Sequence, residues 1–334
     1  MTPDSHERIV RLERVFMPYA QQQRRDAYVR QTNSEPAPGA IIKFAHYTSA
    51  SSAMKIIDEK RIWMRNSKCM SDYSEVQHGF TILQEFFANN NSERERLIAA
   101  LDSCSLGVAR EAINAFEGWM QDTRLNTYIT SVSEHDRSEN FHGRLSMWRA
   151  FGRNAASVAI IIKIQYMSSV YDAIPIVFSP VAYLSKSRAH DVLRNVIDNI
   201  NTEREFIKTI DRNTLVTMVF HMLITAVTCL KHEGFHEEKE WRVIHWPRRQ
   251  PSPLLRAEIK EISGVPQLIY LLPLDMTVSP GLADIDLAHA LDRLIIGPSP
   301  YPWPMYEAFT EALSRAGVKD ARNKVFVSDI PVRS

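Results

Sequence analysis

The chain of 334 residues has little glycine and little cysteine, and both scarcities exclude classes of protein. Its eleven glycines form neither the Gly-x-Gly-x-x-Gly pattern of dinucleotide-binding domains nor a phosphate-binding P-loop. No Gly-x-Ser-x-Gly motif of serine hydrolases occurs. The three cysteines, Cys69, Cys104 and Cys229, form no Cys-x-x-Cys pair, which argues against a disulfide framework or a thiolate zinc site. We therefore expect a protein of the reducing cytoplasm.

The chain also lacks an excess of positive or negative charge and an apolar segment long enough to cross a membrane. The net charge is +1, so no overall field draws the chain to nucleic acid or to an anionic membrane. The most apolar window, 215–230, includes His221 and is too short for a membrane span, so it predicts a buried helix. The first residues have no apolar stretch of signal-peptide length, and we expect no secretion signal.

What remains is the composition of a globular chain with 45% hydrophobic residues, and its patterns predict an α+β fold. Residues 6–30 have the apolar spacing of an amphipathic helix, and 33–39 form a linker. Strands are predicted at 41–47, 128–133, 157–164, 175–184, 241–246, 267–272, 293–297 and 324–328. Helices are predicted at 50–60, 74–89, 92–122, 186–232 with a break near 201, and 303–316. Because strands and helices do not alternate one for one, we expect a mixed sheet and not a doubly wound parallel one.

One short motif matches a known metal site. His232-Glu-Gly-Phe-His236 has the His-Glu-x-x-His spacing that, on an α-helix, holds zinc beside Glu233 as a general base. Gly234 weakens the required helix, and no third ligand follows at a suitable spacing. A zinc hydrolase is therefore one hypothesis, and a helix end with two exposed histidines is the other.

Four separated pieces resemble a bacterial family when they are taken in order. The pieces are Phe44-Ala-His46-Tyr47-Thr48, Arg65-Asn-Ser…Ser71-Asp72-Tyr73-Ser-Glu75, Tyr128-Ile-Thr-Ser131-Val-Ser133-Glu134 with Leu145-Ser-Met-Trp148-Arg-Ala-Phe151-Gly152, and Glu238-Lys-Glu240-Trp241-Arg242. They resemble the family catalogued as domain of unknown function 2971, over roughly residues 41–333. One departure is Ser71-Asp72-Tyr73, where the family usually has Asn-Asp-Pro.

The order of these motifs is also similar to that of the ADP-ribosyltransferase fold. This second resemblance implies a mixed, split β-sheet, with a catalytic domain at 41–334 that carries helical insertions at 74–122 and 186–232. Residues 1–40 are then an added helix and linker, suited to an antitoxin contact or to self-association. The implied function is transfer of ADP-ribose from NAD to a macromolecular acceptor, protein or nucleic acid, in a toxin or phage-defence effector. No metal is expected.

The same resemblance implies roles for particular residues. Glu240 stabilises the cation that forms as nicotinamide leaves, and Glu238, on the same face of an extended chain, activates the acceptor. His46 binds the adenosine ribose. The nicotinamide ring lies among stacking and hydroxyl groups. The residues expected to bind NAD are thus His46, Tyr47, Thr48, Tyr128, Ser131, Ser133 and Trp148.

Each of these residues also has a structural interpretation. His46 is then a core histidine, and Trp148 packs in the core. Ser131 and Ser133 form the polar side of a strand. Glu238 and Glu240 pair with Lys239 or Arg242. A non-catalytic module that binds a nucleotide or a protein segment on the same fold is therefore the main alternative to an enzyme.

Overall fold

The computed structural model describes residues 3–37, 39–69, 73–88, 91–151, 156–165, 170–262 and 264–331. Ser71, Asp72 and Gly152 of the family motifs lie outside them. The chain divides into two compact units. Unit 1 comprises Met1–Arg24, Ser67–Thr127 and Ser179–His236, and unit 2 comprises Arg25–Asn66, Tyr128–Phe178 and Glu237–Ser334. Both predicted helical insertions fall in unit 1, so the chain leaves unit 2 and returns to it twice.

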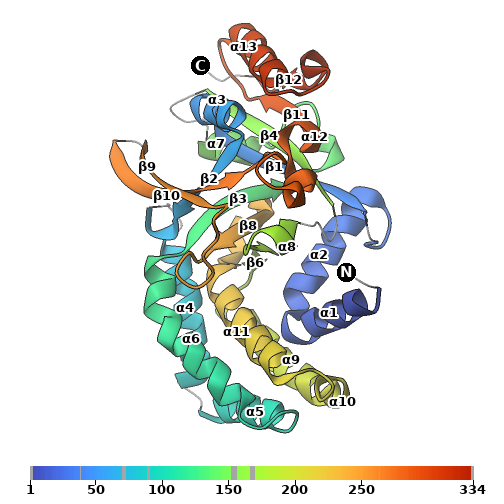
Figure 1. Cartoon of the computed structure of the whole chain (residues 1–334), viewed down its shortest axis with the longest axis vertical. Helices are drawn as coiled ribbons and strands as arrows, with labels where there is room; N and C mark the ends of the chain where they lie inside the picture. Colours follow the sequence, from blue (N-terminus) through green and yellow to red (C-terminus); the bar gives the residue numbers. More distant parts are fainter. Residues whose placement is uncertain are drawn as a thin grey trace. The chain divides into compact units, whose positions relative to one another are not determined.

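Unit 2 is built on a mixed, mostly antiparallel sheet, which confirms the predicted α+β class (Figure 1). Its longest path has the order β12-β11-β4-β1-β3-β2-β10-β9, and β8 pairs with β3 beside this path. Only the pair β11 and β12 is parallel among the strand pairs described in this sheet. The strands are β1 (Ile41–Ser49), β2 (Arg61–Asn66), β3 (Tyr128–Glu134), β4 (Ser157–Gln165), β8 (Glu240–His245), β9 (Arg256–Ile262), β10 (Val265–Pro273), β11 (Leu291–Ile296) and β12 (Val325–Val327); β5 (Val177–Pro180) begins in this unit.

Strand β3 is the point at which this sheet divides. One edge of β3 pairs with β8 from Tyr128 to Ser133. The other edge pairs with β1 only at Ser133 and Glu134 and with β2 only at Tyr128 and Ile129. The two neighbours therefore diverge on either side of Ser131, and no strand in the described part of the chain pairs with Ser131 on that edge.

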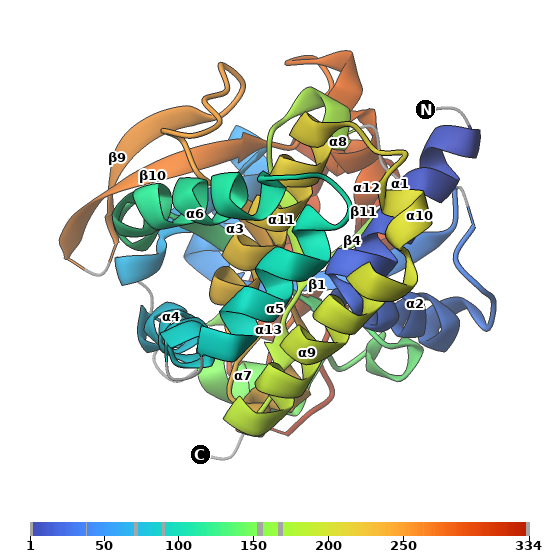
Figure 2. The ribbon, with the colours of Figure 1, turned by 90° about the horizontal axis from the view of Figure 1, so that it is seen from below.

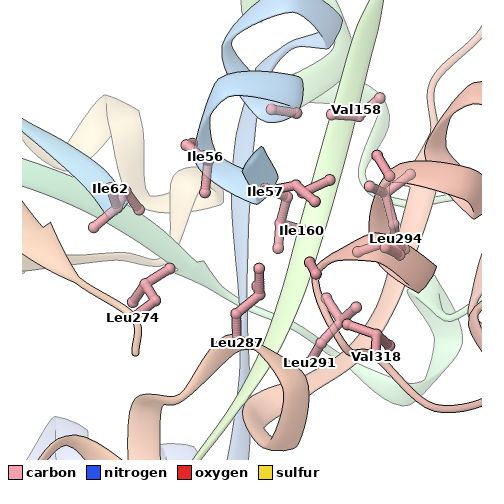
Figure 3. Packing of buried hydrophobic residues seen from close by; sticks show 14 of the residues in the cluster. Ile56, Ile57, Ile62, Val158, Ile160, Leu274, Leu287, Leu291, Leu294 and Val318 are labelled. Carbon is pink, nitrogen blue, oxygen red and sulfur yellow. The ribbon is translucent and has the colours of Figure 1, made fainter. Parts of the chain in front are cut away.

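Helix α3 shows how local sequence and packing combine in unit 2. It begins after Ser49, whose hydroxyl accepts a hydrogen bond from the Ser52 N–H at 3.1 Å, and ends at Lys60 in the left-handed conformation. Its apolar side, with Ile56 and Ile57, packs in a core with strand and helix residues such as Ile160 (Figure 3). The helices of unit 2 are α3 (Ala50–Glu59), α7 (Leu145–Phe151), α8 (Val170–Ala173), α12 (Leu287–Ala290) and α13 (Pro302–Arg315), with 3-10 turns η2 (Arg137–Glu139), η4 (Pro280–Ile285) and η5 (Ala321–Asn323).

Unit 1 is helical, and α11 lies at its centre. This apolar helix contacts α1, α4 and α6, and Figure 2 shows it beside α6. Its helices are α1 (Pro3–Phe16), α4 (Tyr73–Ala88), α5 (Asn91–Asp102), α6 (Val108–Leu125), α9 (Lys186–Thr202), α10 (Arg204–Ile207) and α11 (Arg212–Thr228); α2 (Pro18–Thr32) begins here. The 3-10 turn η1 (Ser67–Cys69) and the short strands β6 (Ala182–Tyr183) and β7 (Leu230–Lys231) complete it, and the 3-10 turn η3 (Glu233–Glu238) begins here. Among the described residues, no helix has the length and apolar character needed to cross a membrane.

Several predicted boundaries differ from those observed. The helix expected at 6–30 is two helices, because α1 ends at Phe16 and α2 begins at Pro18. The helix expected at 92–122 is interrupted before Gly107, which has a φ of +79°. The helix expected to reach 232 ends at Thr228, and the strand expected at 175–184 is two short strands.

The N-terminal helix buries most of its apolar stripe within unit 1, although Ile9 is 40% exposed. Leu12, Val15 and Phe16 are buried, and α1 contacts α9 and α11. Arg11 forms an ion pair with Glu203 at 2.6 Å.

Candidate functional site

Strand pairing places four of the motif side chains on one face of the unit 2 sheet. Ser131 lies opposite Arg242, and Ser133 lies opposite Glu240, in the antiparallel pair of β3 and β8. Directly opposed residues of neighbouring strands point to the same side of a sheet. We call the side that carries Ser131, Ser133, Glu240 and Arg242 the Glu240 face.

Glu240 forms the centre of this face. The Ser131 hydroxyl donates a hydrogen bond to its Oε1 at 2.5 Å. The Arg242 guanidinium donates from Nε to the same oxygen at 2.9 Å, and a second nitrogen lies 3.3 Å from Oε2. Both side chains are buried, with 6% of Glu240 and 2% of Arg242 exposed. The predicted pairing of Glu240 with Arg242 is therefore present, but as a buried pair and not at a solvated edge.

The residues before Glu240 do not continue the strand. Glu238 ends the 3-10 turn η3, and Lys239 has a φ of +44°. The prediction that Glu238 and Glu240 share one face assumed an extended chain through both residues, and that premise is wrong. Lys239 is held by an ion pair with Asp136 at 2.6 Å, and its carbonyl accepts a hydrogen bond from the Glu134 N–H at 3.0 Å. These contacts set the point at which β8 begins.

Arg144 is a residue that the sequence patterns did not indicate. Its guanidinium donates to the carbonyl of Glu134 at 2.6 Å and to those of Glu237 and Glu238 at 3.0 and 2.9 Å. It also pairs with Glu139 at 2.7 Å. Because these partners come from three separate segments, no local spacing in the sequence could have pointed to Arg144. It ties the turn before Glu240 to the end of β3.

Tyr47 and Trp148 lie against each other on the same side of the sheet. Ala45 is opposite Ser133, so Tyr47, two residues further along β1, also points to the Glu240 face. The two rings pack edge to face with centroids 4.8 Å apart, and both are buried. The Tyr47 hydroxyl accepts a hydrogen bond from the Arg144 N–H at 2.9 Å, and burial raises the pKa of Tyr47. The pair forms a packed apolar cluster that includes Ala45.

His46, Thr48 and Tyr128 point to the opposite face of the sheet. His46 precedes Tyr47 on β1 and lies opposite Ile160 of β4. Its Nδ1 is 2.9 Å from the carbonyl oxygen of Ser131, at the division of the sheet. A carbonyl only accepts hydrogen bonds, so Nδ1 carries a proton and, in the neutral ring, Nε2 does not.

The surroundings of these three residues are apolar. His46 borders a cavity of about 60 Å³ that is otherwise lined mainly by aliphatic side chains. Tyr128 packs edge to face against Tyr270, with ring centroids 4.6 Å apart. Thr48 lies opposite Val158 of β4. The structure therefore brings Ser131, Ser133, Glu240, Tyr47 and Trp148 to one side, and His46, Thr48 and Tyr128 to the other.

Burial of His46 makes stability depend on pH. Burial lowers the pKa of His46, and the bond to the Ser131 carbonyl opposes this only in part. The unfolded chain, with a histidine pKa near 6.5, then binds more protons than the folded one. The stabilisation from neutral His46 is complete above about pH 6.5 and is lost as the pH falls toward the folded-state pKa. We expect the free energy of unfolding to decrease below pH 6.5.

Urea unfolding between pH 7.5 and 5 measures this effect. The His46→Gln variant keeps an N–H donor but does not titrate, so its slope should be smaller by up to about 1.4 kcal/mol per pH unit. Burial also lowers the pKa of His135 and His245. The free energy of unfolding of the variant should therefore still depend on pH, but less steeply. Equal slopes for the parent and His46→Gln would contradict the assignment.

The zinc hypothesis loses its geometric basis. Glu233 and His236 lie in the 3-10 turn η3, not in an α-helix, so the spacing does not place two imidazoles on one helix face. His232 accepts a hydrogen bond from the Gly234 N–H through Nδ1, and His236 Nδ1 is 3.1 Å from the Glu233 carbonyl. Across the ranges that the structure describes, no three His, Cys, Asp or Glu side chains form a group suited to a metal ion. Both histidines are exposed, as the competing interpretation expected.

Comparison with known proteins adds one finding. No curated protein and no solved structure matches the chain. A family model described as "Protein of unknown function (DUF2971)" matches residues 147–243, a span that begins in α7 and ends within β8. The resemblance expected from the motifs is thus confirmed for the part of the chain that contains Trp148, Glu240 and Arg242, where the sequence carries a domain similar to that of the DUF2971 family.

Proposed function

We propose that the chain is an ADP-ribosyltransferase-like enzyme that uses NAD as its substrate and transfers ADP-ribose to a macromolecular acceptor. The observation that carries this proposal is the 2.5 Å hydrogen bond from Ser131 to the buried Glu240 carboxylate. It joins two motifs that are 109 positions apart in the sequence. A carboxylate fixed in this way is suited to stabilising a developing positive charge.

The arrangement of the strands also supports the proposal. The strand with the Ser-x-Ser motif, β3, has the Glu240 strand on one edge and the His46 strand on the other. The motif order implied a split sheet of the ADP-ribosyltransferase type, and a site shared by the three motifs requires that their strands lie side by side, as they do here. We propose this finer fold description together with the function.

In the proposed reaction, the bond between nicotinamide and ribose breaks and nicotinamide leaves with the bonding electrons. An oxygen or nitrogen of the acceptor then bonds to the ribose carbon, and its proton passes to solvent. Glu240 accepts a hydrogen bond from the ribose 2′-hydroxyl and stabilises the cation. Ser131 keeps the carboxylate in place. Glu238, half-buried at the turn before β8, is the proposed group that receives the acceptor's proton on the way to solvent.

The other predicted NAD contacts fit less directly. Tyr47 and Trp148 are packed against each other, so a nicotinamide ring would have to separate them in order to stack. His46 points to the opposite face, and its contact with this site passes through the Ser131 carbonyl. We therefore assign His46 a positioning role for Ser131 in place of the ribose contact.

The non-catalytic alternative is favoured by one observation. Arg242 already neutralises the Glu240 carboxylate, and the pair is buried. A carboxylate in such a pair is also what a purely structural network would contain. A module of this kind would bind NAD or a related nucleotide without consuming it. Measuring NAD binding and nicotinamide release separately distinguishes this module from an enzyme.

The decisive experiment follows nicotinamide release from NAD by the purified chain, with cell lysate added to supply an acceptor. The Glu240→Gln variant retains the shape and a hydrogen-bond acceptor for Ser131 but loses the negative charge. Removal of one electrostatic group that stabilises a transition state commonly costs about a hundredfold or more in rate, and we expect a loss of that size. Glu261→Gln, an exposed glutamate of β9, is the matched control and should retain activity.

Each result has a defined meaning. Equal release by the parent and by Glu240→Gln would remove Glu240 from the mechanism. NAD binding measured by calorimetry without release would establish the non-catalytic module, and neither binding nor release would contradict both hypotheses. His46→Gln should slow release without weakening NAD binding; a weaker binding constant would restore the ribose contact expected from the sequence.

A further inference from the structure

The hairpin of β9 and β10 leaves an uncovered edge on the sheet of unit 2. β9 is the last strand of the longest path (Figure 1), and no strand in the described part of the chain pairs with its outer edge. β10 pairs with β2 only from Ile269 onward, whereas its pairing with β9 begins at Val265. The outer half of the hairpin is therefore a ribbon of two strands, and such a ribbon is marginally stable in water without further pairing.

The two faces of β9 differ in character. Ile259 lies opposite Leu268 of β10, and these two side chains are 74% and 46% exposed. Glu258 and Lys260 point to the other face, where they form an ion pair at 3.0 Å with 21% and 28% of their side chains exposed. The free edge thus presents an apolar residue on one face and one charge of each sign on the other. An exposed edge with an apolar centre favours pairing with a further strand.

The length of β9 suits pairing with a second copy of itself. Directly opposed residues of an antiparallel pair point to the same side of a sheet. Two identical strands related by a two-fold axis therefore meet with one residue opposite itself. β9 has seven residues, from Arg256 to Ile262, and Ile259 is the middle one. Only a register centred on Ile259 pairs all seven residues of each strand.

The charges of β9 favour the same register. It places Glu258 of each copy opposite Lys260 of the other, and Ile259 opposite itself. A register centred on Glu258 or on Lys260 would instead place identical charges opposite each other, which is destabilising. The ion pair within each strand can thus extend across the axis. On the other face, Ile259 and Leu268 of both hairpins form one apolar row across four strands.

We propose that the chain forms a two-fold symmetric dimer in which β9 pairs antiparallel with β9 of a second copy, in the register centred on Ile259. This pairing gives partners to the backbone N–H and C=O groups on the outer edge, and it joins the two sheets into one. An interface of one strand from each copy is small, so we expect a reversible dimer with a dissociation constant of micromolar order. The dimer does not rest on the proposed reaction.

Sedimentation equilibrium of the whole chain, from about 1 to 200 micromolar, tests the proposal. The parent should approach twice the mass of one chain. Ile259→Lys places two positive charges opposite each other at the axis and should raise the dissociation constant about a hundredfold or more. Leu106→Lys, at an apolar position of unit 1 that is 82% exposed, is the matched control and should dimerise as the parent does. Circular dichroism checks that both variants are folded.

Two results would overturn the dimer. One is a parent that stays monomeric over the whole range, even if another protein binds at Ile259, because the edge would then belong to a different partner. The other is an Ile259→Lys variant with an unchanged dissociation constant, because the contact between copies would then lie elsewhere.

An exchange of charges tests the register. Glu258→Lys and Lys260→Glu each place like charges opposite each other, and each should weaken the dimer by about tenfold or more. The variant with both substitutions restores opposite charges across the axis and should recover most of the affinity. If this double variant dimerised no better than the single ones, the register centred on Ile259 would be wrong.

Discussion

Replacement of Glu240 by alanine should lower the free energy of unfolding by about 3–5 kcal/mol, because it removes one partner of a buried ion pair. The Arg242 guanidinium lies 2.9 Å from the Glu240 carboxylate, and 2% of its side chain is exposed. Ser131 also loses the acceptor of its 2.5 Å hydrogen bond, which adds to the cost.

Urea unfolding followed by circular dichroism measures this loss, and a double-mutant cycle assigns its cause. Glu240→Leu, Arg242→Met and the double variant are compared with the parent. If the two charges stabilise each other, the double variant should lose about 1–3 kcal/mol less stability than the sum of the two single losses. Strictly additive effects would show that the two charges are not coupled, and would contradict the ion pair as the cause of the loss.

Replacement of Phe44 by alanine should be comparably destabilising, by about 3–5 kcal/mol, because it leaves a cavity in the core of unit 2. The Phe44 side chain is fully buried. Its ring centroid lies 5.1 Å from that of Phe178 and 5.0 Å from that of Trp241, in edge-to-face contacts. Loss of the ring therefore removes both buried area and two aromatic contacts.

The same unfolding measurement has a control on the same strand. Ile41 is 44% exposed, and Ile41→Ala should change stability by no more than about 0.5 kcal/mol. Phe44→Leu fills part of the space, so its loss of stability should lie between those of Phe44→Ala and Ile41→Ala. If Phe44→Ala were no more harmful than Ile41→Ala, the cluster around Trp241 would not be part of the core.

The predicted strands and helices with strong local signals are present in the structure. Residues 41–47 and 157–164 are apolar and rich in branched side chains, and they form β1 and β4. Strands β2, β7 and β9 were missed. β9 reads Arg-Ala-Glu-Ile-Lys-Glu-Ile and is mostly exposed, so it lacks the buried apolar run that identified the others. Its pairing with β10 defines it, and pairing partners are not visible in a local pattern.

At the candidate site, too, local sequence patterns could not show how strands pair. The motifs predicted one site for Ser131, Ser133 and Glu240, and the register of β3 and β8 places these side chains on one face of the sheet; their role in a site stays a prediction. The sequence could not show that His46 faces the other way, because its side depends on the register between β1 and β3. Nor could it show that Lys239 has a positive φ, which places Glu238 outside the strand.

By itself, the sequence determined the α+β class, the helical character of the long insertions and the residue types available to the site. These follow from periodicity and composition, which act over a few neighbouring residues. Tertiary structure decided which side chains meet: the pairing of Glu240 with Arg242 and Ser131, the placement of Arg144 at the turn, and the position of Ile259 opposite Leu268 at the edge of the sheet. Such contacts depend on strand register and helix packing between distant segments, and local sequence patterns do not specify either one.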